Sequence, residues 1–246
     1  MRIPRIYTDQ PLTVGSEIVP EPEATRHLIQ VLRLRVGSDL ALFNGDGHDY
    51  SAELIEADKK SCRVSIQQQG EKEPPQPLDI ELAIGISKGE RMDFALQKAV
   101  ELGVSHFSLL TTERTVVRLS AERLQKRLDH WRKIIIGACE QSGRRYIPKI
   151  SSHGQLQPWL ESIPDNLFGL VLDHQSGISL CDLKPPQNRQ KISLLIGPEG
   201  GLSTTEVDAA ATAGYQRTRL GPRVLRTETA PLAATAAIQA LWGDFC

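Results

Sequence analysis

The stretch Lys191–Glu206, KISLLIGPEGGLSTTE, decides the fold class of this 246-residue chain. Its first part is almost continuously apolar, which is typical of a strand that is buried on both faces of a parallel sheet. A glycine-rich turn, Gly197–Gly201, follows, and Ser203 and Glu206 then have the spacing of a capping box that begins a helix. A strand, a turn and a helix in this order predict an α/β unit, and the turn lies where such sheets bind ligands.

The glycine-rich turn does not match the common phosphate-binding motifs. No Gly-Lys-Ser/Thr follows it and the G-x-G-x-x-G spacing is missing, which excludes a phosphate loop and a dinucleotide fingerprint. Glu199 within the turn would repel a phosphate. A tight strand-to-helix connection that binds nothing is the alternative interpretation of this turn taken alone.

A second loop, Leu220–Ala234 (LGPRVLRTETAPLAA), favours a ligand. The start of a helix explains Thr227–Pro231, because these residues suit a cap and a first helical turn. It does not explain Arg223 and Arg226, which flank the apolar pair Val224–Leu225. Two arginines on either side of an apolar pair suit a site where the arginines bind a polyanion and the apolar residues bury a flat ring.

Strands and helices alternate along most of the chain, which predicts a mostly parallel sheet covered on both faces. Strands are expected in LDIELAIGIS, HFSLLTT, LFGLVLD, KISLLIG and YQRTRLG, and a long helix in Ala121–Gln141. Three short strands and one helix precede them. The Pro-rich, charged stretch Gly70–Leu78 separates the two patterns. We therefore expect a small β-rich domain at residues 1–72 and an α/β domain at residues 73–246.

Composition narrows the class of protein. The chain is 40% hydrophobic and 24% charged, as in ordinary globular proteins, and no apolar run is long enough to span a membrane. The N-terminal MRIPRIYTDQ has no signal-peptide pattern, so we expect a cytoplasmic protein. The four cysteines contain no C-x-x-C pair and the histidines are not at metal spacing, which predicts buried free thiols and no metal site.

Charge is distributed unevenly, although the net charge is only −1. Between Ala121 and Lys149 there are eight Lys or Arg residues and three acidic residues. Such a local excess is typical of a surface that follows nucleic-acid phosphates, and solvated helix faces produce it too.

The motifs together resemble one family of RNA-modifying enzymes. LLIGPEGGLSTTE followed by LGPRVLRTETAPLAA resembles the cofactor-binding half of the SPOUT methyltransferases, and the RsmE family most closely. Further resemblances are RHLIQVLRLRVGS, KGERMDFALQKAVELGV, ERTVVRL and WRKIIIGACEQSGRRYIPKI, so the likeness covers nearly the whole chain. It implies a trefoil-knotted parallel sheet, a PUA-like barrel in front of it, a homodimer, and S-adenosylmethionine bound in the knot without a metal.

The resemblance also implies roles for particular residues. The cofactor-binding residues would be Leu172, Gly197, Pro198, Glu199, Gly200, Gly201, Leu220, Gly221, Leu225, Arg226, Thr227, Thr229 and Ala230. The residues that contact RNA would be Arg26, His27, Arg33, Arg35, Lys88, Arg91, Gln141, Arg144, Arg145 and Arg223.

The family methylates N3 of a uridine in 16S ribosomal RNA, and this is the activity we expect. Because N3 carries a proton, the reaction needs a base or a group that stabilises the resulting anion. We expect Arg226 to stabilise the anion and Glu199 or Glu228 to act as the base, with helix capping as the alternative role of Glu228. The alternatives are methylation of transfer RNA or of a ribose hydroxyl, and an assembly factor that binds RNA without catalysis.

Overall fold

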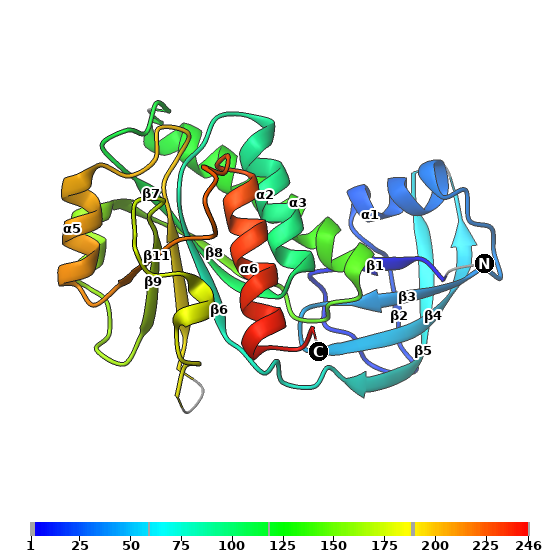
Figure 1. Cartoon of the computed structure of the whole chain (residues 1–246). Helices are drawn as coiled ribbons and strands as arrows, with labels where there is room; N and C mark the ends of the chain where they lie inside the picture. The colour runs from blue at the N-terminus through cyan, green and yellow to red at the C-terminus, as the bar shows by residue number, and fades with distance from the viewer. Residues whose placement is uncertain (1–2, 59, 118, 188–189, 246) are drawn as a thin grey trace. The chain divides into compact units, whose positions relative to one another are not determined.

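The computed structural model describes residues 3–58, 60–117, 119–187 and 190–245 (Figure 1). The chain divides into two compact units. One comprises Met1–Pro75 together with Cys139–Ile147, and the other comprises Gln76–Ala138 and Pro148–Cys246. The last strand of the first unit ends at Lys72.

The first unit contains a five-stranded sheet in the order β1-β3-β4-β5-β2. Its strands are β1 (Arg5–Tyr7), β2 (Glu17–Ile18), β3 (Asp39–Phe43), β4 (His48–Ala57) and β5 (Cys62–Lys72). Alternate residues of β4 and β5, such as Leu54 and Val64, are buried in one hydrophobic core. The short strands β1 and β2 were not expected, since two or three residues carry too little pattern to be recognised.

A helical segment covers part of this core. It begins as α1 (Pro22–Arg26) and continues as a π-helical turn, His27–Val31. The sequence predicted one helix among the first strands, and this segment contains the fully buried Leu28. The segment ends at Arg33, whose φ of 55° is left-handed.

The second unit contains a six-stranded sheet in the order β11-β9-β10-β6-β7-β8, and all of its strand pairs are parallel. Its strands are β6 (Ile80–Gly85), β7 (Val104–Thr111), β8 (Lys149–Gln155), β9 (Phe168–Leu172), β10 (Ile192–Ile196) and β11 (Gln216–Thr218). The central strands β6 and β10 are buried at every residue, as near-continuous apolar runs predict. The parallel α/β fold is thereby confirmed.

Among its described residues the second unit contains five named helices, and four of them contact each other in two pairs. They are α2 (Glu90–Glu101), α3 (Ala121–Ser142), α4 (Leu156–Leu160), α5 (Thr204–Thr212) and α6 (Thr229–Trp242). Helices α2 and α6 lie side by side (Figure 1). Helices α4 and α5 contact each other and share a core cluster with Ala83 and Leu195 of the sheet. The capping box of Ser203 and Glu206 at the start of α5 is confirmed.

Strand β8 and one cysteine differ from expectation. The sequence of β8, KISSHGQ, is polar, because this strand lies at the edge of the sheet and, among the described strands, pairs with β7 alone. Cys62 and Cys139 are buried free thiols, but Cys181 is exposed in the 3-10 turn Leu180–Asp182, and Cys246 lies outside the described residues. No helix in the described ranges is long and apolar enough to cross a membrane.

Candidate functional site

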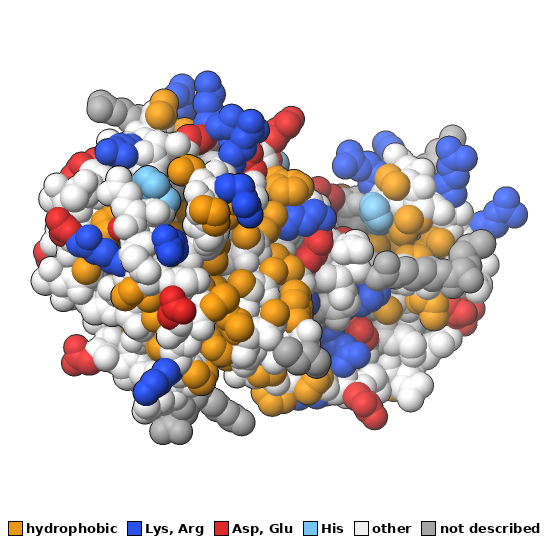
Figure 2. All heavy atoms as spheres, in the orientation of Figure 1, with side chains coloured by type: hydrophobic (Ala, Val, Ile, Leu, Met, Phe, Trp, Pro, Cys, Tyr) orange, Lys and Arg blue, Asp and Glu red, His pale blue; other side chains and the backbone are white. Residues whose placement is uncertain are grey.

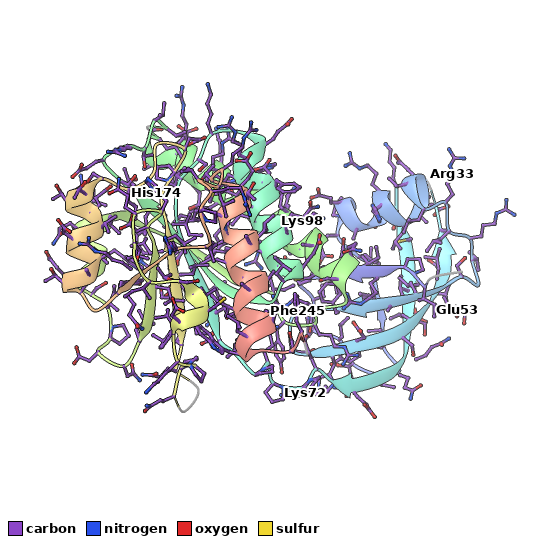
Figure 3. All side chains as sticks on the ribbon, in the orientation of Figure 1. Arg33, Glu53, Lys72, Lys98, His174 and Phe245 are labelled. Carbon is purple, nitrogen blue, oxygen red and sulfur yellow. The ribbon has the colours of Figure 1, made fainter. Side chains whose placement is uncertain are left out.

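A cavity of about 360 Å³ lies beyond the carboxyl ends of β9, β10 and β11 in the second unit. Three connections form its walls: the loop after β9, the turn after β10 and the loop after β11. Its lining residues are Arg114, Leu172, Asp173, His174, Gln175, Ile196, Gly197, Pro198, Glu199, Gly200, Gly201, Leu202, Thr204, Val207, Arg217, Thr218, Arg219, Leu220, Gly221, Arg223, Val224, Leu225, Arg226, Thr227 and Ala230. Figure 3 labels His174, in the wall that follows β9.

The turn after β10 is held on one side by the connection between β6 and α2. The backbone N–H of Lys88 donates a hydrogen bond to Glu199 Oε1 at 2.8 Å. Arg91 Nη1 lies 3.7 Å from the same oxygen. Two predicted RNA contacts and one predicted catalytic residue are thus brought together by the fold.

The same turn is held on its other side by the segment that follows β7. Arg114 Nη1 donates to the carbonyl oxygen of Gly200 at 2.9 Å. Glu206 Oε1 accepts from the backbone N–H of Glu113 at 2.8 Å, while Oε2 accepts from the N–H of Ser203 at 2.9 Å. Sequence reasoning missed Arg114 and this second role of Glu206. The available signal was the position of ERTVVRL directly after a predicted strand.

Two glycines of the turn are required by its geometry. A Cβ atom on Gly197 would lie 2.5 Å from the carbonyl carbon of Gly201, so any larger residue would push the two ends of the turn apart. Gly201 has a φ of 68°, which residues with a side chain rarely adopt. The turn therefore owes its shape to its glycines before any ligand binds.

The C-terminal end of the loop after β11 is hydrogen-bonded to the turn after β10. Thr227 Oγ1 donates to the carbonyl oxygen of Gly197 at 3.1 Å and lies 3.2 Å from Ser87 Oγ. The carbonyl oxygen of Arg226 accepts hydrogen bonds from Thr229 and Ala230. These contacts fix the backbone of Arg226, while its side chain remains exposed at the cavity wall.

Most of the predicted cofactor-binding residues line the cavity; Thr229 does not, and neither does the predicted catalytic residue Glu228. Glu228 occupies the N-cap position of α6, but its side chain makes no capping hydrogen bond. Its Oε2 atom is buried without a hydrogen-bond partner in the described part of the chain, and Arg91 Nε is 4.0 Å away. The capping role that sequence reasoning allowed for the Glu228 side chain is therefore wrong.

Several lining residues were not foreseen. Asp173, His174 and Gln175 directly follow β9, and Arg217 and Arg219 flank the end of β11. The rule that ligands bind beyond the carboxyl ends of parallel strands would have found them, had it been applied to every strand.

The cavity wall carries a mixed charge. It includes five arginines, at positions 114, 217, 219, 223 and 226, and two acidic residues, Asp173 and Glu199. Arg217 is paired with Asp208. In Figure 2 Lys and Arg side chains gather along the upper edge of this unit. Within the described ranges no three His, Cys, Asp or Glu side chains are grouped to hold a metal ion.

The first unit carries its own set of predicted RNA contacts. Arg26, His27, Arg33 and Arg35 are all exposed on or just after its helical segment. Figure 3 labels Arg33, which extends away from the ribbon. The four side chains are therefore accessible to solvent, and their contact with RNA stays a prediction.

The predicted contacts at the end of α3 are less available. Gln141 is exposed, whereas Arg144 and Arg145 are partly buried. Arg145 Nε donates to Asp49 Oδ2 at 3.0 Å and its Nη1 donates to the carbonyl oxygen of Glu71 at 2.7 Å. Arg145 therefore ties together parts of the first unit, a structural role that the sequence did not reveal.

The chain resembles known proteins in both of its units. The model of the RNA methyltransferase domain matches residues 74–239, and that of the RNA methyltransferase PUA domain matches residues 19–67. The chain is 34% identical to the ribosomal RNA small subunit methyltransferase E of Buchnera aphidicola from Schizaphis graminum, over 99% of this chain and 98% of that protein.

Two solved structures match over their full length. One is a ribosomal RNA small subunit methyltransferase E from Neisseria gonorrhoeae bound to S-adenosyl methionine, with 39% identity, a TM-score of 0.91 and complete coverage of both chains. The other, from Legionella pneumophila and described as a methyltransferase in complex with the cofactor SAM, has 39% identity, a TM-score of 0.94 and complete coverage of both chains.

Proposed function

The chain belongs to the ribosomal RNA small subunit methyltransferase E family, and on that premise we propose that it transfers a methyl group from S-adenosylmethionine to the RNA of the small ribosomal subunit. One observation carries the proposal. A cavity formed by the motifs GPEGGL and LGPRVLRT lies in a chain that aligns end to end with relatives solved with that cofactor.

The residues of the cavity suit this cofactor. From Leu220 to Leu225 the backbone makes no hydrogen bond to another described residue, so its N–H and C=O groups are available to the edge of an adenine ring. Leu172, Ile196 and Val207 provide apolar surface for the ring faces. Asp173 and Glu199 provide negative charge for the ribose hydroxyls and the cationic sulfonium.

The protein's own groups have to orient and deprotonate the acceptor. S-adenosylmethionine supplies an already activated methyl group, so alignment of donor and acceptor is the main task of the site. We assign stabilisation of the uracil anion to Arg226, because its backbone is fixed and its side chain lies at the cavity wall. We assign the base to Glu199, which lines the cavity, in preference to Glu228, which does not.

We propose N3 of a uridine in 16S ribosomal RNA as the methylated atom, on the strength of the family resemblance. Lys88, Arg91 and Arg223 in the second unit would contact phosphates near the target. The residue 1–72 domain would contribute Arg26, His27, Arg33 and Arg35 as a second RNA-binding surface, with Gln141 and Arg144 beyond it.

We further propose a cytoplasmic homodimer with a trefoil-knotted sheet. Exposed apolar residues support the dimer: Phe94 of α2 is 47% exposed and Leu241 of α6 is 44% exposed. Figure 2 shows hydrophobic side chains over the outer face of α6. Leu241→Glu should shift the protein from dimer to monomer in light scattering, and an unchanged mass would exclude this face.

The test of the proposed function is methyl transfer from labelled S-adenosylmethionine to three substrates: small subunits that lack the modification, naked 16S RNA and bulk transfer RNA. We expect N3-methyluridine, identified by mass spectrometry, in the subunit sample. Label in transfer RNA or on a ribose would replace this substrate assignment, and cofactor binding without any transfer would indicate an assembly factor.

A further inference from the structure

A second cavity, of about 290 Å³, lies beyond the carboxyl ends of β7 and β8 in the second unit. Its lining residues are Thr111, Thr112, Glu113, Gln155, Leu156, Gln157, Thr205 and Glu206. No residue in the predicted cofactor or RNA sets belongs to it. It is small for a ligand pocket, so it suits a single flat ring rather than a dinucleotide.

The chemistry of this cavity favours a neutral, flat, polar ligand. Among the described residues that line it there is no lysine or arginine, and the exposed carboxylate of Glu113 would repel a phosphate. The side chains of Gln155 and Thr205 are exposed and form no hydrogen bond with other described residues. Leu156 is buried and offers an apolar contact. Amide and hydroxyl groups beside an apolar surface are typical readers of a base edge.

The second cavity adjoins the first one. Glu113 lines the second cavity and the next residue, Arg114, lines the first; the same holds for Thr205 and Thr204. The hydrogen bond between the N–H of Glu113 and Glu206 Oε1 joins the two segments at this boundary. The two cavities are therefore neighbours in the second unit, because the segments Glu113–Arg114 and Thr204–Thr205 contribute to both.

We propose that the second cavity binds one unstacked nucleobase of the RNA substrate, next to the base that is methylated. This inference rests on the proposed function. The ionised Glu113 carboxylate accepts hydrogen bonds and cannot donate them, so it favours the exocyclic amino group of a base such as cytosine. Uracil offers a single N3–H donor that lies between two carbonyl oxygens, and the carboxylate repels these oxygens. The target uridine and its neighbour thus occupy sites of different chemistry.

Binding of free nucleosides tests the site directly. The full-length protein is first saturated with S-adenosylhomocysteine, which fills the first cavity. Cytidine, uridine and inorganic phosphate are then titrated while the side-chain amide resonances of Gln155 and Gln157 are followed by NMR. We expect cytidine to shift these resonances more than uridine or phosphate. An equal or larger response to uridine or phosphate, or no response to cytidine, would overturn the proposal.

Methyl transfer provides an independent readout. Gln155→Ala should raise the KM for small subunits by at least about fivefold, as expected for the loss of one base contact, while the Kd for S-adenosylmethionine stays unchanged. The matched control is Gln125→Ala, which removes an exposed glutamine of α3 whose side-chain amide donates a hydrogen bond to Asp129. Failure of the unmodified protein to methylate would refute the proposed function, whereas an active protein with an unchanged KM in Gln155→Ala refutes the second site alone.

Discussion

The turn after β10 and the loop after β11 face the same cavity, but they are held very differently. The turn is fixed by contacts from Lys88 N–H to Glu199 and from Arg114 to Gly200, and the first turn of α5 that follows it is fixed by the contact from Glu113 N–H to Glu206. The loop makes no hydrogen bond to other described residues between Leu220 and Leu225, and Val224 is 75% exposed. One wall is therefore built before the ligand arrives. The other wall must lose conformational freedom when the ligand binds, which lowers the net affinity.

The largest expected effect is a loss of kcat on substitution of Arg226, the residue at which the loop after β11 again forms backbone hydrogen bonds. Arg226→Ala should lower kcat by about 100- to 1,000-fold, the range found when one group that stabilises an anion is removed. Arg223 lies in the part of the loop that forms no backbone hydrogen bonds to other described residues. Arg223→Ala should therefore mainly raise the KM for RNA. Steady-state kinetics on small subunits separates the two. Equal losses of kcat in both variants would show that the fixed backbone of Arg226 has no special role.

The next effect concerns the shape of the turn itself. Gly197→Ala places a methyl group 2.5 Å from the carbonyl carbon of Gly201. We expect the free energy of unfolding to fall by about 3 kcal/mol, the upper end of the range for overpacked sites. The Kd for the cofactor should rise at least tenfold, which corresponds to roughly 1.4 kcal/mol of binding free energy. Differential scanning calorimetry and titration calorimetry measure the two quantities.

Gly221→Ala is the matched control in the free loop. A Cβ atom there meets nothing within 4 Å, and only the positive φ of 78° opposes it. The expected cost is at most about 1–2 kcal/mol for a left-handed alanine, and less if the loop relaxes. If Gly221→Ala lowered the free energy of unfolding more than Gly197→Ala, the loop after β11 would be the more tightly constrained wall of the cavity, contrary to our expectation.

A smaller effect is expected at the boundary between turn and neighbouring segment. In Glu206→Gln the side chain has only one carbonyl oxygen, so it cannot accept from both Ser203 N–H and Glu113 N–H. Leaving one buried donor unpaired should lower the free energy of unfolding by about 1–3 kcal/mol. Urea unfolding measures this, with Glu161→Gln as the exposed control, expected to change stability by less than about 0.5 kcal/mol. Equal stabilities of the two variants would mean that the link to Glu113 contributes nothing.

These contacts also show how far the sequence could predict the site. Local patterns were sufficient for the strand of β10, the glycine turn and the capping box of Ser203 and Glu206, because each depends on neighbours in the chain. The contacts of Glu206 with Glu113 and of Gly200 with Arg114 join segments more than 80 residues apart. No local pattern encodes them.

Two further misses have the same kind of cause. Strand β8 is polar because only one neighbour pairs with it, so hydrophobicity could not reveal it. Arg145 belongs to a basic run that suggested RNA, yet its guanidinium bonds to Asp49 and Glu71. Charge in a sequence indicates that a partner is needed, and only the fold decides whether that partner is RNA or another part of the chain.

The smallest expected effect concerns the contact between Asp79 and His106, which lies outside the cavity lining, and tests whether such a contact affects cofactor binding. Asp79 directly precedes β6, at the amino end of the strand and therefore at the end away from the cavity. A hydrogen bond from His106, together with one from Ser105, lowers the pKa of Asp79 from 3.8 to about 2. Because the folded pKa is lowered, this carboxylate stabilises the protein above about pH 4, and that contribution is lost as the pH falls from 3.8 toward 2. The side chain is 47% exposed, so solvent screening limits the contribution to less than about 1 kcal/mol.

Asp79→Asn should therefore flatten the dependence of unfolding free energy on pH between about 4 and 2, relative to the exposed control Asp165→Asn. Urea unfolding at a series of pH values measures this dependence. The Kd for S-adenosylmethionine at neutral pH should stay the same, because no residue of the Asp79 pair lines the cavity. A change in that Kd would mean that contacts at the amino end of the sheet also shape the fixed wall, and that the turn after β10 is not held by its immediate neighbours alone.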